Sequence, residues 1–152
     1  MYQYSQRIAH LQELRVTNEP KPLRRVVRVL IPNEKRKVLF ARQADREQWH
    51  FPGGNIKENE KPITAARREA KQETGLYCNR LRWIRTEYLS HENEDEEIWC
   101  YRGSVKNYRE MKPDGSEIDL LKWCGLKTTK RLHLTDTTSL LLQNIAIISL
   151  FV

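Results

Sequence analysis

The chain has 152 residues, which is enough for one domain with a single hydrophobic core and short for two. Lys and Arg together number 27 and Asp and Glu number 20, so the net charge is +7. Hydrophobic residues make up 39% and charged residues 31%, which excludes both a membrane bundle and a disordered tail. The positive charge predicts an anionic partner, such as phosphate groups, nucleic acid or an acidic surface.

Cysteine usage bears on the redox compartment. Cys78, Cys100 and Cys124 are odd in number and contain no Cys-x-x-Cys pair, which disfavours both a zinc site and a disulfide framework. We therefore expect reduced, buried thiols in a cytoplasmic protein. The N-terminal segment carries charges throughout and has no apolar run, so no secretory signal is expected.

The first elements expected along the chain are a helix and two strands. Apolar residues at helical spacing predict a short helix over 5–15, within an N-terminal extension (1–22) of a single domain that spans 1–152. β-Branched residues predict a strand over 23–31. A polar turn separates it from a second predicted strand over 37–42, so we expect these two strands to form a hairpin.

The best-defined helix is predicted over 62–74. Pro62 suits the first helical position, and Gly75 suits a left-handed C-terminal cap. Three apolar residues fall on one stripe and are expected to form the buried face of this helix: Ile63, Ala66 and Ala70.

The second half of the chain predicts three strands and a last helix. The strands are expected over 81–90, 97–105 and 118–123, the first two around an acidic turn. The helix, over 137–152, has almost no polar face, but its uncharged stretch is shorter than the ~20 residues of a membrane span. We expect it to pack on the domain or to form a homodimer contact. The whole pattern is mixed α/β without regular βαβ alternation.

The end of the helix over 62–74 carries a group of oxygen-bearing side chains. Residues three and four apart share a helix face, so Glu69, Gln72 and Glu73 project together. Carboxylates at this spacing can share a hard divalent cation, and the Gly53-Gly54 turn lets the backbone come close to them. A solvated charged face is the alternative that helix geometry alone leaves open.

The segment Gly54–Leu76 resembles the Nudix box, G-x5-E-x7-R-E-U-x-E-E-x-G-U, in which U is an aliphatic residue. The fixed positions are occupied, at the spacing of the pattern, by Gly54, Glu60, Arg68, Glu69, Ala70, Glu73, Gly75 and Leu76. The departure is Gln72, which stands where the pattern has the first residue of its Glu-Glu pair. Trp49 to Gly54 also resembles the family's approach to the box.

This resemblance implies a fold and an activity. The fold would be α/β of the α+β type, a Nudix-like α/β/α sandwich with a curled mixed sheet between helices. The activity would be hydrolysis of a pyrophosphate bond in a nucleoside diphosphate linked to another group, with Mg²⁺ or Mn²⁺ as cofactor. Residues near the box do not match the signals of coenzyme A, ADP-ribose or dinucleoside polyphosphate hydrolases, which leaves nucleoside di- or triphosphates as the preferred substrates.

Carried over by position, the resemblance also implies site residues. Glu69 and Glu73 would be metal ligands or the base that activates water, with the division of roles left open. Arg68 would orient these carboxylates, with Glu60 as its ion-pair partner. The further metal ligands would be the Gly54 carbonyl, the neutral Gln72 side chain and Glu117, with Asp119 second to Glu117.

Basic residues would hold the phosphate that does not react through charge-assisted hydrogen bonds. Arg42, at the end of the second expected strand, is the first candidate. The weaker candidates are Arg24, Arg25, Arg28 and Lys57. Asp136 either caps the last helix or contacts the base, as a polar residue does there in some Nudix enzymes of the MutT type. The four histidines are expected to be packing or surface residues, although His50 borders the glycine turn.

Gln72 supports an alternative interpretation. It removes one formal negative charge from the metal site, which predicts weaker metal affinity or fewer bound ions. The alternative is a catalytically weakened Nudix-like module that binds a nucleotide or RNA. The net charge and the segment Arg80-Leu81-Arg82-Trp83 agree with this alternative, although RNA is not the preferred partner.

Overall fold

The computed structural model describes residues 20–144. The helix expected over 5–15 and the end of the helix expected over 137–152 lie outside this range. The strands are β1 (Leu23–Leu30), β2 (Val38–Gln43), β3 (Trp49–His50), β4 (Gly53–Asn55), β5 (Cys78–Ser90), β6 (Asp95–Val105) and β7 (Ile118–Cys124). The helices are α2 (Pro62–Thr74), α3 (Leu126–Thr129) and α4 (Asp136–Asn144), with a 3-10 turn η1 (Tyr108–Glu110).

Strand β1 lies inside a four-stranded mixed sheet with the order β4-β1-β6-β5. It runs parallel to β6 and antiparallel to β4, while β5 and β6 form a long antiparallel hairpin. The acidic turn predicted between β5 and β6 closes this hairpin, with Ser90 opposite Asp95. Strands β3 and β4 were not predicted, because two and three residues are too few to show an alternating pattern.

Strand β2 belongs to a separate antiparallel sheet with the order β3-β2-β7. The predicted hairpin between the first two strands is therefore wrong. Both edges of β1 are hydrogen-bonded, to β4 and to β6, so β2 has no edge of β1 to join. The two strands meet near their connecting turn, where the Leu39 N–H donates to the Ile31 carbonyl (3.0 Å) and Pro32 bridges to Val38.

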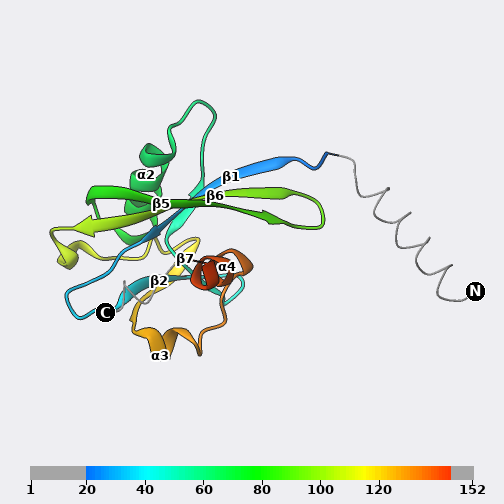
Figure 1. Cartoon of the computed structure of the whole chain (residues 1–152). Coiled ribbons are helices and arrows are strands. Elements are labelled where there is room, and N and C mark those ends of the chain that lie inside the picture. Colours follow the sequence, from blue (N-terminus) through cyan, green and yellow to red (C-terminus); the bar gives the residue numbers. More distant parts are fainter. Residues whose placement is uncertain (1–19, 145–152) are drawn as a thin grey trace, which may run out of the picture.

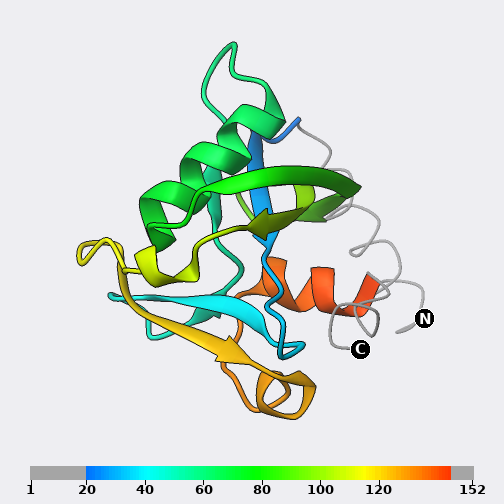
Figure 2. The same ribbon diagram turned by 90° about the vertical axis from the view of Figure 1, so that its left-hand side faces the viewer.

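The elements form layers around the four-stranded sheet (Figure 1). Helix α2 covers one face, and the second sheet and α4 lie on the other side, as the turned view in Figure 2 also shows. Val27, which packs toward α2, and Val26, which packs toward α4, belong to separate hydrophobic clusters because neighbouring strand residues face opposite ways. The expected mixed α+β class is confirmed, with the curled sheet divided into two.

Helix α2 has the predicted bounds and carries the glutamates of the box. Its C-terminal cap Gly75 has φ 75°, and its N–H donates to the Lys71 carbonyl. Ala66 and Ala70 are buried as predicted, but Ile63 is 37% exposed and the third buried apolar position is Ala65. Ile63 lies in the first turn of α2, at its outer end.

Helix α4 begins at Asp136, and Thr135 precedes it. The Thr138 N–H points to the Thr135 side-chain oxygen (3.4 Å), and the Ser139 N–H donates to the Thr135 carbonyl (2.9 Å). Thr135 thus acts as the N-terminal cap in place of Asp136, which is the first helical residue. None of the helices between residues 20 and 144 is both long and apolar enough to span a membrane.

Candidate active site

Helix α2 directs two carboxylates at the turn where β4 begins. Glu69 and Glu73 are four residues apart, so they lie one above the other on the same helix face. The Glu73 Oε2 accepts from the Gly53 N–H at 3.3 Å. A β-carbon built on Gly54 would lie 2.6 Å from the Glu69 carboxyl carbon, which shows how closely this side chain approaches the glycine backbone. The two carboxylates therefore converge on one glycine turn.

These groups line a cavity of about 260 Å³, which we call the carboxylate pocket. Its lining includes Gly54, Glu69, Glu73, Glu117, Arg28 and His50. Glu117 comes from the loop before β7, so acids from two distant parts of the sequence meet in one cavity. Of the residues predicted to bind metal, four line this pocket, and Gln72 is exposed on the helix beside it.

Arg68 ties the helix face to the loop before α2. Its guanidinium donates to both carboxylate oxygens of Glu60, at 2.9 and 2.8 Å, which is the ion pair that the sequence predicted. It also donates to Glu69 (2.6 Å), Gln72 (3.2 Å) and the Asn55 carbonyl. Hydrogen bonding to Arg68 lowers the pKa of Glu60 to about 2. The Glu60 carboxylate is therefore charged near neutral pH and remains paired with the Arg68 guanidinium.

Burial and neighbouring charges shift the pKa values of two residues that line the pocket, Glu73 and His50. Burial raises the pKa of Glu73 to about 8, although the Arg28 guanidinium and the Gly53 N–H act in the opposite direction. Burial and the charge of Arg28 lower the pKa of His50 to about 4, so its imidazole is neutral near pH 7. The His50 Nδ1 lies 2.8 Å from the Phe51 carbonyl, which fixes the proton on Nδ1 because a carbonyl can only accept.

Arg28 and His50 each present a buried nitrogen to this region. The Arg28 Nε and the His50 Nε2 have no hydrogen-bond partner among residues 20–144. The contacts of Arg28 are long, 3.5 Å from Nη1 to His50 and 3.4 Å to the Phe51 carbonyl. A cation held this loosely beside a pocket is suited to bind an added anionic group.

The donor set fits a hard divalent cation. Carboxylate and carbonyl oxygens are the ligands that Mg²⁺ prefers, and the Glu69 carboxylate already lies against the backbone of Gly54. Within residues 20–144, no three acidic, histidine or cysteine side chains lie close enough together to form a complete metal cluster.

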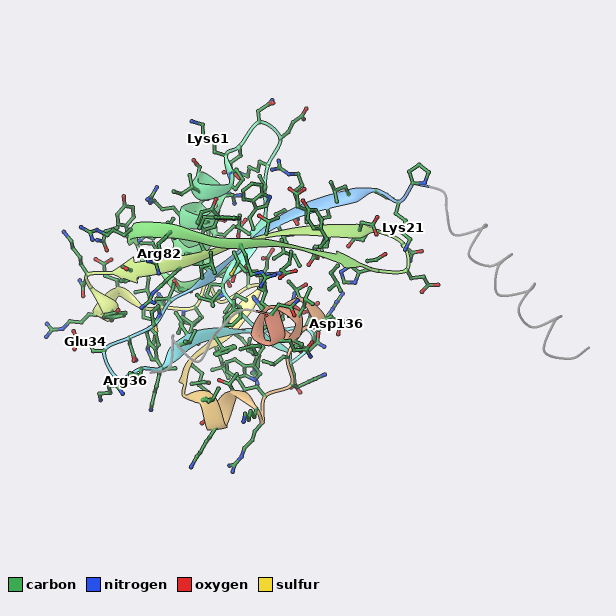
Figure 3. All side chains as sticks on the ribbon, viewed as in Figure 1. Lys21, Glu34, Arg36, Lys61, Arg82 and Asp136 are labelled. Atoms are coloured by element: carbon green, nitrogen blue, oxygen red, sulfur yellow. The ribbon has the colours of Figure 1, made fainter. Side chains whose placement is uncertain are left out.

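A second cavity of about 540 Å³ adjoins the carboxylate pocket, and we call it the outer cleft. The two cavities share Arg24, Arg28, Gln43 and Thr135. The outer cleft extends to Asp136, which Figure 3 labels beside α4. Arg24 is held in place by the fully buried Glu96, which also accepts a hydrogen bond from the Thr137 hydroxyl (2.5 Å).

The structure does not bring three of the predicted substrate-binding residues to either cavity. Arg42 donates two hydrogen bonds to Asp119 of β7, at 2.9 and 2.5 Å, so its guanidinium is already occupied. Arg25 faces the other side of β1 and pairs with Glu97 (3.0 Å). Lys57 is exposed in the loop before α2.

Other polar residues line the two cavities, and the sequence indicated some of them but not others. Arg24 and Arg28 share a strand face with Val26 because side chains alternate along β1, and this alternation separates them from Arg25. Gln43 and Thr135 carried no sequence signal, since Gln43 ends β2 and Thr135 precedes α4, and only the folded chain brings them to the same cavities. His50 was set apart by its position next to the glycine turn.

Comparison with known proteins identifies the family of the chain. The sequence model of the NUDIX domain matches residues 22–141, and the chain therefore belongs to the Nudix family. It is a hydrolase acting on pyrophosphate bonds, the class of enzyme that the sequence predicted.

Two relatives illustrate the range of this similarity. An RNA pyrophosphohydrolase of Bartonella henselae is 33% identical over 137 residues, which cover 70% of this chain and 79% of that protein. The 8-oxo-dGDP phosphatase NUDT18 of Danio rerio is 27% identical over 129 residues, which cover 76% of this chain but 36% of that protein.

Solved structures support the fold. A MutT protein of Methanosarcina mazei Go1 superposes with a TM-score of 0.69 at 20% identity, covering 80% of this chain and 91% of that one. A C. elegans Ap4A hydrolase superposes with a TM-score of 0.62 at 20% identity, covering 82% and 98%. At such identities the likeness concerns the fold alone.

Proposed function

We propose that the chain hydrolyses a pyrophosphate bond of a nucleoside 5′-di- or triphosphate with Mg²⁺ or Mn²⁺. The observation that carries this proposal is the convergence of Glu69 and Glu73 on the Gly53–Gly54 turn, in a pocket that shares Arg28 with the adjoining outer cleft. The carboxylates would hold the metal ion and Arg28 would bind phosphate oxygens, so that each binds a different part of a metal-bound pyrophosphate.

Four groups would hold the metal ion: the carboxylates of Glu69, Glu73 and Glu117 and the Gly54 carbonyl. Gln72 could add its neutral side-chain oxygen by turning away from Arg68. When bound, the ion neutralises phosphate charge and lowers the pKa of bound water.

The remaining roles belong to the chain's own side chains. Arg68, held by Glu60, fixes the direction of the Glu69 carboxylate. Glu69 and Glu73 divide between them the tasks of metal ligand and base. Arg28, whose contacts are long and whose Nε has no partner among the described residues, would hold the phosphate that does not react.

The nucleoside would lie in the outer cleft. Asp136 is exposed at its edge and can accept hydrogen bonds from ring or amino N–H groups of a base. The cleft extends well beyond the carboxylate pocket, so the reacting phosphates and the base can occupy separate cavities. Arg42, Arg25 and Lys57 are not part of this proposed binding mode.

A second candidate substrate is the 5′-polyphosphate end of RNA. It is favoured by the relative of Bartonella henselae, an RNA pyrophosphohydrolase that aligns over 70% of this chain. The chemistry at the carboxylate pocket would be the same, since both substrates present a 5′-linked pyrophosphate. A mononucleotide and an RNA end differ beyond the first nucleoside, where the RNA continues through a 3′-phosphodiester.

The chain is also proposed to act in the cytoplasm. Cys78, Cys100 and Cys124 are all free and buried, which suits a reducing compartment. Burial raises the pKa of Cys78 to about 11 and that of Cys100 to about 12, so these thiols stay protonated and unreactive. The homodimer contact expected for the helix over 137–152 falls in part on residues 145–152, which lie outside the described range.

The test is a substrate panel with Mg²⁺, Mn²⁺ or EDTA. The panel contains nucleoside di- and triphosphates, 8-oxo-dGDP and an RNA oligonucleotide with a 5′-triphosphate, and phosphate or pyrophosphate release is measured. We expect metal-dependent cleavage of at least one nucleotide, lost in Glu69→Gln and in Glu73→Gln with the fold retained by circular dichroism. Wild-type protein that cleaves nothing with either ion would contradict the proposal.

A further inference from the structure

Four arginines from three elements line a groove of about 660 Å³ on the β5–β6 side of the sheet. They are Arg67 of α2, Arg80 and Arg82 of β5, and Arg102 of β6. This arginine groove shares no lining residue with the carboxylate pocket or the outer cleft. In Figure 3, Arg82 lies on the opposite side of the view from Asp136, so the groove is well separated from the outer cleft.

Two of these arginines repel each other directly. Arg82 and Arg102 are partners in the antiparallel register of β5 and β6. Like charges placed opposite each other on neighbouring strands destabilise a sheet. The ion pairs found among residues 20–144 involve other arginines, such as Arg24 and Arg68, and none of the four in the groove. Their mutual repulsion is therefore not relieved within the described part of the chain.

Protection of the sheet edge does not account for the cluster. Strand β5 is the edge strand of its sheet, and charged side chains on an edge discourage pairing with other molecules. This can explain Arg80 and Arg82. It cannot explain Arg102 on the inner strand β6, or Arg67, which reaches the groove from α2 and donates to the Cys78 carbonyl (3.1 Å).

The groove also contains an acceptor that a simple anion would leave unused. The Asn79 Oδ1 lines it and is buried without a hydrogen-bond partner among the described residues. This acceptor needs a donor, which a phosphate or carboxylate does not supply and which a ribose 2′-hydroxyl does. Next to the groove, Arg67 lies 5.8 Å from the ring centre of Tyr77, which is 54% exposed, and bases stack on such aromatic surfaces.

We propose that the arginine groove binds single-stranded RNA through its phosphodiester backbone. The guanidinium groups contact successive phosphates, a 2′-hydroxyl donates to Asn79, and the exposed ring of Tyr77 accepts a stacked base. The site is separate from the carboxylate pocket and binds RNA whether or not the RNA end is a substrate.

The test isolates the groove from the active site. A fluorescently labelled single-stranded RNA with a 5′-hydroxyl end is titrated with the full chain in EDTA, and anisotropy is measured. Such RNA has no pyrophosphate bond to cleave, and EDTA removes divalent ions. The variant Arg80→Gln/Arg82→Gln/Arg102→Gln should bind at least ~10-fold more weakly, and the slope of log K against log salt should be smaller by about 2.

The matched control removes the same charge elsewhere. Lys127→Gln/Lys130→Gln/Arg131→Gln neutralises three exposed cations in and after α3, and it should bind RNA within ~2-fold of wild type. Equal loss in both triple variants, or no loss in the groove variant, would overturn the proposal. The single variants Arg82→Gln and Arg102→Gln should each weaken binding about 2- to 3-fold, which keeps the test decisive where the triple variant folds poorly.

Two competitors identify the ligand class. DNA of the same sequence should bind more weakly than RNA, and a poly-glutamate peptide should not displace RNA at equal concentration. Equal binding of DNA, or displacement by the peptide, would overturn the assignment to RNA. Nucleotide hydrolysis by the groove variant should equal that of wild type. If wild-type protein hydrolyses no substrate but binds RNA through the groove, the proposed function is contradicted and the RNA-binding site is still supported.

Discussion

The carboxylate of Glu69 lies against Gly54, where β4 passes the face of α2. A β-carbon at residue 54 would come within 2.6 Å of the carboxyl carbon, a distance that real side chains do not tolerate. Arg68 holds the same carboxylate from the helix side, at 2.6 Å from Nη1 to Oε1. Because the carboxylate is fixed by Arg68, it cannot move aside freely, and residue 54 has to be glycine for this geometry to exist.

We therefore expect Gly54→Ala to move the Glu69 carboxylate and to lower kcat/KM at least ~10-fold, since displacement of a catalytic group by about 1 Å has effects of this size or greater. The change removes no contact of the core. Gly125→Ala is the control, because a β-carbon at Gly125 would meet nothing within 4 Å. Activity of Gly54→Ala equal to that of Gly125→Ala would show that Glu69 does not need its present position.

Glu73 makes the stability of the metal-free protein depend on pH. Burial raises the pKa of this carboxyl from about 4.5 to about 8, so the folded state favours the protonated form. Its contribution to stability is complete below about pH 4.5 and is lost as the pH rises through about 8. Glu73→Gln cannot ionise, so this loss should disappear.

Thermal unfolding in EDTA between pH 5 and pH 9 measures this effect. At pH 9 we expect Glu73→Gln to be more stable than wild type by at least ~1 kcal/mol, which corresponds to a rise in Tm of about 3 °C. Glu58→Gln, a change at an exposed carboxyl in the loop before α2, should follow the wild-type curve. Parallel pH curves for wild type and Glu73→Gln would mean that Glu73 titrates like an exposed carboxyl.

The box helix could be predicted from sequence because its information is local. Pro62, Gly75 and the spacing of the acids are all determined within one element, and the structure reproduces its bounds and the ion pair of Arg68 with Glu60. The predicted hairpin failed for the opposite reason. The pairing of β1 depends on β6, a strand about 70 residues later, which no local pattern specifies.

The phosphate-binding arginines show the same limit. Arg42 was favoured as a basic residue at a strand end, but Asp119 lies beside it across the ladder of β2 with β7. Arg24, Arg25 and Arg28 were ranked together as weaker candidates without regard to the pleat, which turns Arg24 and Arg28, and not Arg25, toward the cavities. The sequence showed that the strands carry arginines. Which of these side chains face the cavities depends on which sheet each strand joins, and the sequence did not show this.

Gln72 sits where a carboxylate would complete the box, and its Oε1 accepts from Arg68 at 3.2 Å. Gln72→Glu adds one negative charge at the edge of the carboxylate pocket without a change in size. We expect Mg²⁺ to bind roughly 3- to 10-fold more tightly, because the affinity of such sites increases with the charge of their ligands. Titration calorimetry with Mg²⁺ and Mn²⁺ measures this change.

The control for this variant is Lys71→Gln, which also makes the neighbouring helix surface more negative by one charge but at a side chain that contacts the Gly75 carbonyl. If both variants raise the affinity equally, the effect is a general electrostatic one. If neither does, Gln72 lies outside the metal site and its substitution for Glu does not weaken the enzyme.

Arg28 sets the pH range in which Glu73 can ionise. Its guanidinium opposes the effect of burial on Glu73, so its removal should raise the pKa of Glu73 above its present value near 8. Metal binding requires the ionised carboxylate and releases its proton. In Arg28→Gln, the pH at which Mg²⁺ binding reaches half its maximum should therefore move upward, whereas Arg28→Lys, which keeps the charge, should stay close to wild type.

Arg25→Gln is the matched control, because Arg25 lies on the same strand, faces away from the pocket and pairs with Glu97. An unchanged midpoint in Arg28→Gln, measured by calorimetry from pH 6 to pH 9, would show that Arg28 does not act on Glu73.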